Sequence, residues 1–386
     1  MKNNPKLLVY ILMLSALGIN TPLSIVGIIS QISEYFNTSI AITGLYVSSF
    51  TFTIAACGLF MPIIFSKYER KRTFVFILTV FAIANAIIIF TKNIYVASIS
   101  RIISAIFYPA FISIALTVCE EIAPEGEEQD YITKILLGIS IGSIVGLPIT
   151  TAIGTVLGYQ MAMAWIFLIN LVTLILIIIY FPNMEGKSKS YEVPVSSLKS
   201  EKFIMGSLGI IMMPIGATIV YSYLPYFLQI VTHVYTYNLS ILLFVYGLIS
   251  ISGTWIGGKL IVKNDRVTLI GFQLLCSFVI AAIFFSAEYL IVCILFIFIF
   301  GIMDGLGYNL IQYMESSLLP DTPELANGVF LTIVNGGIAI GTAIGGFLVS
   351  GYGIMSIFPG GILFLILAFV LLYFVIFRMK IKLKFD

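Results

Sequence analysis

Charged residues are scarce in this 386-residue chain. Lysine, arginine, aspartate and glutamate together make up 10% of the sequence, whereas hydrophobic residues make up 60%. A soluble globular domain carries roughly 25% charged residues. The composition therefore excludes a water-soluble globule of this length.

Residues that bind metals or form disulfides are also few. The chain has one histidine, His233, and four cysteines, Cys57, Cys119, Cys276 and Cys293, whose spacing fits neither disulfide pairs nor a metal site. We expect these cysteines to act as small buried hydrophobic side chains. No phosphate-binding glycine loop or catalytic triad is recognisable. The sequence thus predicts no catalytic residues, no metal, no cofactor, no nucleic-acid partner and no enzymatic activity.

Long apolar runs, by contrast, recur along the whole chain. A run of roughly 17 to 25 apolar residues is long enough for a helix to cross a bilayer. The run 7–29 lacks a small-residue cleavage site, so we expect it to remain as a helix and not to be removed as a signal peptide. We predict an all-α membrane protein in a lipid bilayer with twelve transmembrane helices, at residues 7–29, 41–65, 74–91, 94–118, 135–157, 164–182, 203–229, 239–262, 267–287, 289–314, 328–349 and 354–377.

The few cations lie on one side of these predicted spans. If the first span leaves the cytoplasm, 18 of the 20 lysines and arginines fall on the cytoplasmic side, while Lys92 lies outside and Arg101 lies within a span. Cytoplasmic loops of membrane proteins are enriched in lysine and arginine. The charge pattern therefore predicts that both termini are cytoplasmic.

The polar stretch 183–202 divides the predicted spans six and six, so we predict an N-terminal bundle (1–182), a cytoplasmic linker and a C-terminal bundle (203–386). A shift of 196 residues places the charged turn "KNDR" (263–266) on "KYER" (67–70), and a shift of 195 places Gly337 on Gly142. Two independent matches at nearly the same offset indicate a duplicated six-helix unit.

The charged turn after the second span, "PIIFSKYERKR", resembles the signature of the major facilitator superfamily, which reads approximately G-x-x-x-D-R-x-G-R-R/K. Its positions are occupied here by Pro62 at the first glycine, Ser66 at the aspartate, Lys67 at the first arginine, Glu69 at the second glycine, and Arg70 and Lys71 after it. The same eroded signature is typical of a bacterial branch, the sugar, arabinose-type and purine-nucleoside efflux permeases, which are related to the twelve-helix drug:proton antiporters. Because the aspartate is missing, a charge relay in this turn would need another acid, such as Glu69.

Two further stretches resemble this branch. "LLGISIGSIVGLPITTAIGTVLGY", in the span 135–157, is similar to its antiporter motif, and "ELANGVFLTIVNGGIAIGTAIGGFLVSGYG" (324–353) is similar to its asparagine- and glycine-rich run. The resemblance implies two pseudo-symmetric six-helix bundles with a central cavity that opens alternately to the two sides of the membrane. It also implies that the first, fourth, seventh and tenth spans line this cavity.

Ionisable groups inside a membrane are expensive and are therefore functional candidates. Only Arg101 and Asp304 lie clearly within spans, and they occupy the fourth and tenth spans. We assign both to proton coupling, although a structural arginine bonded to helix-end carbonyls and a buried neutral carboxyl are the alternatives.

Polar side chains and helix-breaking residues indicate where a substrate binds. Asp304, Tyr308, Gln312 and Glu315 form one polar stripe of a helix, and "GINTP" (18–22) and "MPIG" (213–216) place glycine and proline inside the first and seventh spans. Paired interruptions of this kind point to a binding site at the bilayer midplane, with packing kinks as the alternative. The predicted substrate-binding residues are Asn20, Thr21, Tyr108, Tyr221, Tyr223, Tyr308, Gln312 and Asn335.

The charged turns and the glycine-rich spans are candidates for gating. An acid within each charged turn suggests an ion-pair latch, since topology depends on cations and is almost indifferent to acids; pure topology signals are the alternative. Glycines every four residues let helices pack closely, which also suits a sliding seam. The predicted gating residues are Ser66, Lys67, Glu69, Arg70, Lys71, Lys263, Asp265, Arg266, Gly142, Gly146 and Pro148.

Together these features predict a secondary active transporter. We expect a proton-coupled exporter (antiporter) of a small organic molecule such as a sugar, nucleoside, drug or metallophore, acting as a monomer in the bacterial plasma membrane. Uptake or facilitated passage is the alternative direction, and a non-transporting membrane sensor is the alternative class.

Overall fold

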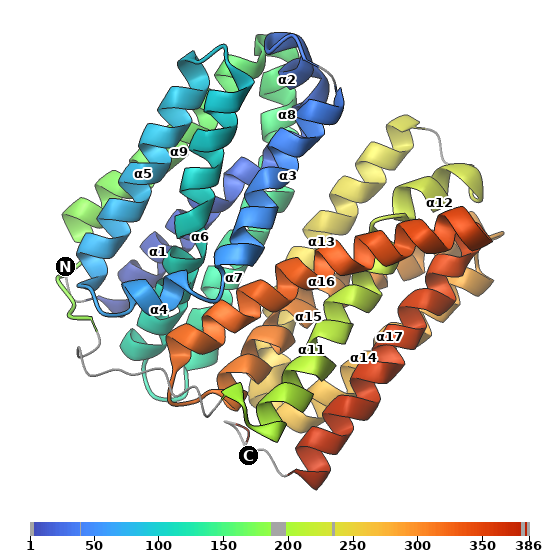
Figure 1. Cartoon of the computed structure of the whole chain (residues 1–386). Helices are drawn as coiled ribbons and strands as arrows, with labels where there is room; N and C mark the ends of the chain where they lie inside the picture. The colour runs from blue at the N-terminus through green and yellow to red at the C-terminus, as the bar shows by residue number, and fades with distance from the viewer. Residues whose placement is uncertain (1–3, 39, 187–197, 234–235, 380–382, 384–386) are drawn as a thin grey trace. The chain divides into compact units, whose positions relative to one another are not determined.

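The computed structural model describes residues 4–38, 40–186, 198–233, 236–379 and 383, and within them helices are the regular secondary structure (Figure 1). Within these ranges eleven helices are long and apolar enough to cross a membrane, and a shorter apolar helix, Leu45–Cys57, lies in the second predicted span. A helix satisfies its own backbone hydrogen bonds, which is why it can cross a medium without water. The prediction of an all-α membrane protein is confirmed.

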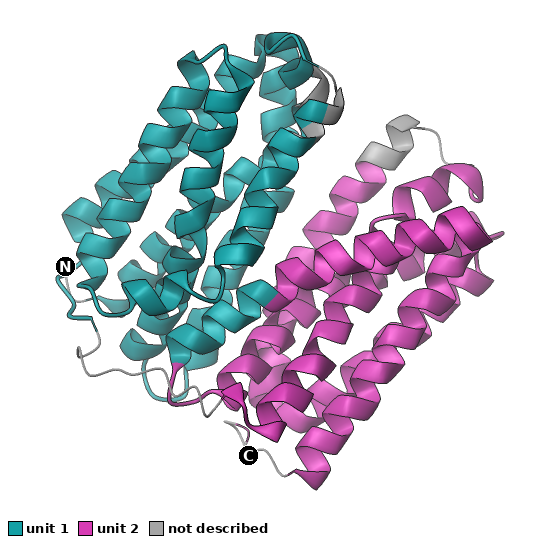
Figure 2. Cartoon of the chain, viewed as in Figure 1, with its two compact units in different colours: residues 1–193, 323–332 teal, residues 194–322, 333–386 magenta. Residues whose placement is uncertain are grey.

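The described chain divides into two compact units, residues 1–193 with 323–332 and residues 194–322 with 333–386 (Figure 2). Most of the predicted linker 183–202 lies outside the described residues. Residues 323–332 follow the linker by more than a hundred positions and nevertheless belong to the first unit. The helix that they begin therefore contributes to both units.

Unit 1 holds the first six predicted spans, and its pairs of packed helices include α5 with α9 and α1 with α7. The first, second and fifth spans each consist of more than one helical segment. Its elements are α1 (Pro5–Asn20), the 3₁₀ segment η1 (Thr21–Ile28), α2 (Ile29–Tyr35), α3 (Ile40–Cys57), α4 (Met61–Phe65), α5 (Arg70–Phe90), α6 (Ile94–Ile122), α7 (Glu128–Ile144), α8 (Gly146–Leu157) and α9 (Tyr159–Tyr180).

Unit 2 holds the remaining spans apart from the start of the eleventh, and its pairs of packed helices include α13 with α15 and α11 with α17. Its elements are α11 (Glu201–Tyr221), α12 (Leu224–Ile230), α13 (Thr236–Lys263), α14 (Asp265–Phe285), α15 (Leu290–Leu318), α16 (Pro323–Tyr352) from residue 333 onward, η2 (Ile354–Ser356), α17 (Ile357–Tyr373) and the π-helical η3 (Phe374–Arg378).

The duplication predicted from the sequence is visible in helix lengths. Helices α5 and α14 both have 21 residues, and α6 and α15 both have 29. Gly158 ends α8 with a φ of 88°, and Gly353, which lies 195 positions later, ends α16 with a φ of 83°. This left-handed conformation favours glycine, so both repeats stop their fifth span by the same device.

Prolines explain two of the breaks within spans. Pro22 has no N–H to donate to the carbonyl of Gly18, which instead accepts the Thr21 hydroxyl at 2.6 Å, and α1 gives way to the 3₁₀ segment η1 at this point. Pro148 likewise has no N–H for the carbonyl of Ile144, where α7 ends. The interruption predicted at "GINTP" is therefore present.

The corresponding interruption predicted at "MPIG" is wrong. Helix α11 continues through Pro214 to Tyr221, and the chain leaves the α-helix only at Ser222 and Tyr223. A proline within a membrane helix is tolerated when neighbouring elements accommodate the ring and the freed carbonyl. Here Pro214 lies against Gly337 of α16, where any side chain would collide with the ring.

Candidate functional site

Three groups of polar side chains in the described part of the chain are candidates for a functional site: a pocket in unit 2, a buried network in unit 1, and an ionic cluster where α5 begins. The pocket encloses about 250 Å³ between α11, α14, α15 and α16. Its polar members are Thr218, Tyr221, Ser222, Asp304 and Tyr308, and the rest of the lining is aliphatic, aromatic or sulfur-bearing: Met213, Pro214, Ala217, Phe272, Cys276, Phe300, Met303, Gly307, Ile311, Val334 and Ile338.

Asp304 is the one acid of this pocket. Its side chain is exposed within the pocket, and its carboxylate receives only a long contact of 3.5 Å from the Ser250 hydroxyl. Among the described residues it forms no ion pair. A carboxylate without a cation, in a largely apolar cavity, is available to bind a proton or a polar group of a ligand.

Aromatic rings form one side of the same pocket. The ring of Tyr221 stacks on that of Tyr246 with centroids 5.3 Å apart, and Tyr246 in turn meets Phe300 at 6.2 Å. Tyr221 itself is 45% exposed, so one of its faces remains available. The pocket therefore offers flat apolar faces next to a carboxylate and several hydroxyl groups.

Three residues predicted to bind substrate do not line this pocket, although they lie in the same unit. The Tyr223 hydroxyl donates to the carbonyl of Thr342 at 3.0 Å. Gln312 is 2% exposed and donates to the Ser316 hydroxyl at 3.0 Å. Asn335 is half-buried on α16, adjacent to the pocket residue Val334.

The three predicted substrate residues of unit 1 are buried and bonded to the protein itself. Asn20 accepts a hydrogen bond from the Tyr108 hydroxyl at 2.8 Å and donates to the carbonyl of Ile139 at 2.7 Å and to the Ser143 hydroxyl. Thr21 is 1% exposed and caps the end of α1. This network ties α1, α6 and α7 together at the point where the first span changes from α-helix to 3₁₀-helix.

Arg101 is 2% exposed and lies on α6 without a carboxylate partner among the described residues. One of its guanidinium nitrogens donates to the carbonyl of Pro22 at 2.7 Å. The guanidinium also lies over the rings of Phe50 and Tyr46, at 4.7 and 5.4 Å from their centroids. Cation–π contacts and a helix-break carbonyl thus replace an ion pair in stabilising this buried charge.

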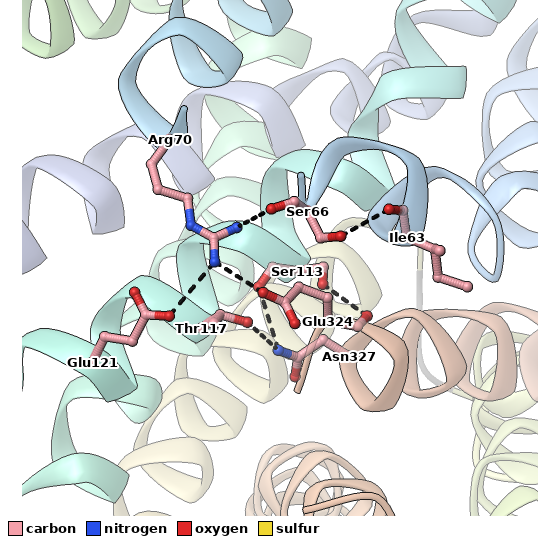
Figure 3. A network of polar contacts seen from close by, with 8 residues as sticks. All are labelled: Ile63, Ser66, Arg70, Ser113, Thr117, Glu121, Glu324 and Asn327. Atoms are coloured by element: carbon pink, nitrogen blue, oxygen red, sulfur yellow. Dashed lines mark hydrogen bonds and ion pairs between the residues drawn. The ribbon is translucent and has the colours of Figure 1, made fainter. Parts of the chain in front are cut away.

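The ionic cluster is centred on Arg70, the first residue of α5, which is 1% exposed (Figure 3). Its guanidinium contacts Glu324 at 2.9 Å and Glu121 at 3.5 Å, and it donates weakly to the carbonyl of Ser66 at 3.4 Å. Glu324 is fully buried and is the second residue of α16, whereas Glu121 is 41% exposed and is the last residue but one of α6. Arg70 thereby joins α6 to the first turn of α16.

Neutral hydrogen bonds extend this cluster along α16. The Ser113 hydroxyl donates to the carbonyl of Glu324 at 3.0 Å. Asn327 donates to the carbonyl of Ser113 at 3.3 Å and to the Thr117 hydroxyl at 3.4 Å. Figure 3 shows that neutral groups bond the first turns of α16 directly to α6, and that the charged groups of the two helices meet at Arg70 of α5.

The remaining charged gating candidates lie elsewhere. Glu69 pairs locally with Arg72 at 2.6 Å, while Lys67 is exposed and Lys71 is half-buried. In the other repeat Asp265 begins α14, is buried, and accepts a hydrogen bond from the Tyr313 hydroxyl. Lys263 and Arg266, on either side of it, are exposed.

The glycine-rich faces pack within their own units. A side chain at Gly142 would collide with the carbonyl of Leu17 on α1, and Gly146 faces Ser24 and Thr21 of η1. In unit 2, Gly341 lies in the same way against Ile215 of α11. These contacts are those expected if the glycines serve close packing of helices within a unit. Pro148 lies in the first turn of α8, beside this face.

Sequence reasoning missed Glu324, Glu121, Ser113, Thr117 and Asn327. Glu324 opens the asparagine- and glycine-rich run that was compared with the efflux permeases, and it directly follows a proline at the start of a helix. An acid in the first turn of a helix is ordinarily explained by the helix dipole. Its pairing with an arginine 254 positions earlier has no local signal.

Comparisons with known proteins agree with this architecture. The sequence profile of the Major Facilitator Superfamily matches residues 8–333. A protein of Helicobacter pylori (strain P12) named "Probable sugar efflux transporter" is 27% identical over 369 residues, covering 94% of this chain and 93% of that protein. The Bacillus subtilis (strain 168) protein named "Uncharacterized MFS-type transporter YtbD" is 24% identical and covers 92% of this chain and 90% of its own length.

Solved structures show the same fold. The transporter FucP, crystallised in an outward conformation, superposes with a TM-score of 0.77 at 17% identity, over 96% of this chain and 98% of FucP. The human organic anion transporter MFSD10 superposes with a TM-score of 0.73 at 11% identity, over 96% of this chain and 99% of its own. The chain is a multi-pass membrane transporter that belongs to the Major Facilitator Superfamily.

Proposed function

We propose that this transporter exports a small polyhydroxylated molecule, such as a sugar, in exchange for protons. The observation that carries the proposal is the pocket of unit 2, in which a single carboxylate, Asp304, lies among aromatic rings and hydroxyl groups. Export by alternating access requires a site that binds the substrate in one state and releases it in the other, and this pocket is the best candidate in the described chain.

Asp304 suits proton coupling because nothing fixes its charge. Its only described side-chain partner is the Ser250 hydroxyl at 3.5 Å, and hydroxyl groups bind both the neutral and the ionised form of a carboxyl. A carboxylate that accepts hydrogen bonds from a substrate loses this ability when it is protonated. Proton and substrate would then bind alternately, as antiport requires.

The lining suits a sugar-like substrate. The exposed face of Tyr221 can cover the apolar face of a pyranose ring, while Asp304 and the hydroxyls of Tyr308, Thr218 and Ser222 can bond its hydroxyl groups. Small-molecule sites typically combine such apolar walls with a few convergent polar groups. The relatives from Helicobacter pylori that are named probable sugar efflux transporters support the same class.

The cluster around Arg70 is our candidate latch between transport states. It fixes the first ten residues of α16 to unit 1, whereas the rest of this helix belongs to unit 2. A latch of this kind stabilises one state until its ion pair is broken. In this proposal Glu324 supplies the acid that the signature lacks at Ser66.

We also propose a setting for this activity. Cations concentrated on one side of the spans support a bacterial plasma membrane location with both termini in the cytoplasm, where α5 would begin. The working unit in this proposal is a monomer, and its partners are the substrate, protons and the surrounding lipid.

The test uses purified protein in two assays. A thermal-shift screen with D-glucose, inosine and tetraphenylphosphonium distinguishes sugar, nucleoside and amphipathic cation, and we expect stabilisation by the sugar class. In proteoliposomes with an imposed pH gradient, Asp304→Asn should abolish accumulation of the stabilising ligand while leaving its exchange across the membrane intact.

Asp321→Asn is the matched control, because Asp321 lies exposed in the turn before α16. Accumulation that persists in Asp304→Asn with normal pH dependence would refute proton coupling through this residue. Stabilisation by tetraphenylphosphonium alone would replace the sugar with an amphipathic cation, and movement only down the concentration gradient in the parent protein would indicate a facilitator.

A further inference from the structure

Helix α15 carries a second acid, which is buried and which the proposed function does not use. Glu315 lies three residues before the end of α15, and its side chain has no exposed surface. One carboxyl oxygen is 3.5 Å from the Ser207 hydroxyl of α11, and the other oxygen has no hydrogen-bond partner within the described chain.

No cation in the described part of the chain neutralises this carboxyl. The charged groups on the elements around this end of α15 are Glu201 and Lys202 of α11, Lys259 and Lys263 of α13, Asp265 and Arg266 of α14 and Arg378 of η3. None of them forms a described ion pair with Glu315. Lys259 lies over the Trp255 ring at 3.5 Å, and Asp265 is bonded to Tyr313.

An ionised carboxylate in such surroundings is strongly unfavourable, because burial removes its water without supplying a cation. A purely structural role would be served better by glutamine or by an apolar residue. The neutral carboxyl, by contrast, fits the site as it is, since it needs one acceptor and the Ser207 hydroxyl can provide it.

A polar stripe connects Glu315 to the pocket. Asp304, Tyr308, Gln312 and Glu315 follow one another on α15 at spacings of four, four and three residues, which places them on one face of the helix. Asp304 and Tyr308 line the pocket, and Gln312 bonds to Ser316 one turn farther on. The two acids are about 16 Å apart along the helix axis, at 1.5 Å per residue.

We propose that Glu315 is a second proton-carrying residue, which passes protons between Asp304 and the side of the membrane at which α15 ends. The neutral Glu315 carboxyl first releases its proton to water at its own end of the helix. Protonated Asp304 then passes its proton through Tyr308 and water along the stripe to the Glu315 carboxylate, so Glu315 is neutral again, Asp304 is ionised, and one proton has left the pocket. This inference rests on the proposed proton coupling through Asp304.

Infrared difference spectroscopy of the protein in lipid nanodiscs tests the proposal without a known substrate. The carboxyl C=O band of a protonated acid is expected to weaken as the pH rises, and Glu315→Gln should remove one component of this change. Ser207→Ala keeps the acid and should shift the frequency of that component without removing it. Glu324→Gln is the matched control, because that buried acid is paired with Arg70 and should contribute no protonated band.

The relay itself is tested by a rapid pH jump. The Asp304 component of the spectrum is identified as the one that Asp304→Asn removes. In Glu315→Gln this component should respond to the jump at least roughly tenfold more slowly than in the parent protein, since a proton-transfer group has been removed. An unchanged rate would overturn the inference and leave the proposed function intact. A Glu315 component that does not change with pH would also overturn it. An Asp304 component that never responds to pH would instead overturn the proposed function, and the relay with it.

Discussion

Replacing Glu324 by glutamine removes one charge from a buried ion pair with little change in shape. In the parent protein Arg70 and Glu324 are 1% and 0% exposed, and they are 2.9 Å apart. After the change, the acidic partner that the buried guanidinium keeps among the described residues is Glu121, at 3.5 Å and with a 41% exposed side chain. We expect the first turns of α16 to leave α6 more often.

The size of the effect lies between two limits. Breaking a buried pair typically costs about 3 to 5 kcal/mol, whereas a solvent-exposed pair contributes about 0 to 1 kcal/mol. Because Glu121 remains and glutamine retains an acceptor oxygen, we expect the closed state, in which α16 contacts α6, to lose about 2 kcal/mol of stability. At 1.4 kcal/mol per factor of ten, this loss corresponds to a roughly 30-fold larger population in which α16 has left α6.

Cysteine labelling measures this population directly. Ser113 is 0% exposed and donates to the carbonyl of Glu324, so Ser113→Cys places a thiol beneath α16 with a minimal change in volume. The rate of its reaction with a maleimide then reports how often this part of α16 opens. The background lacks the native thiols, namely Cys57, Cys119, Cys276 and Cys293.

Glu69→Gln is the matched control for loss of an acid at the same end of unit 1. Glu69 pairs with Arg72, which is 86% exposed, so its removal should change labelling at most roughly fivefold, the equivalent of about 1 kcal/mol. If Glu324→Gln accelerates labelling no more than Glu69→Gln does, the buried pair does not hold α16 and the latch is refuted.

Three further changes test the other sites. Arg101→Lys should lose most transport activity, because an ammonium cannot reproduce the stacking on Phe50 together with the hydrogen bond to the helix break; full activity would show that only the charge matters. Asn20→Ala should lower the thermal unfolding temperature, because the Tyr108 hydroxyl and the Ile139 carbonyl lose their partner and each such buried group costs about 1 to 3 kcal/mol. A normal unfolding temperature with weakened ligand binding would make Asn20 a substrate contact instead. Tyr221→Ala should weaken binding of the ligand found by thermal shift while Tyr223→Ala should not, because Tyr221 lines the pocket and Tyr223 does not. Equal effects of the two changes would place the ligand elsewhere.

The fold could be predicted from the sequence because membrane helices are encoded locally. Each span is a largely apolar run, and the repeat is visible in equivalent positions such as Gly158 and Gly353. Breaks were harder to predict, because a proline alone does not determine one. Helix α1 ends just before Pro22, whereas Pro214 lies inside α11. The difference depends on whether a neighbouring helix leaves space for the proline ring, as Gly337 does for Pro214, and on what bonds to the freed carbonyl.

The sites could be predicted only in part, and for a related reason. The intramembrane residues Asp304 and Arg101 were identified by their rarity, which is a property of the sequence. Whether Asn20 faces a ligand or the protein depends on Tyr108, which is 88 residues away, and a pattern within one helix carries no such information.

Residues 323–332 also determine what happens if the chain is cut. The chain passes between the units three times, at 193/194, 322/323 and 332/333, so these ten residues form an arm of the second half that is held within the first. A protease site inserted into 187–197 would sever only the first crossing. The two fragments should then remain associated through the bonds of Glu324 and Asn327, and halves expressed from separate genes should find each other by the same arm.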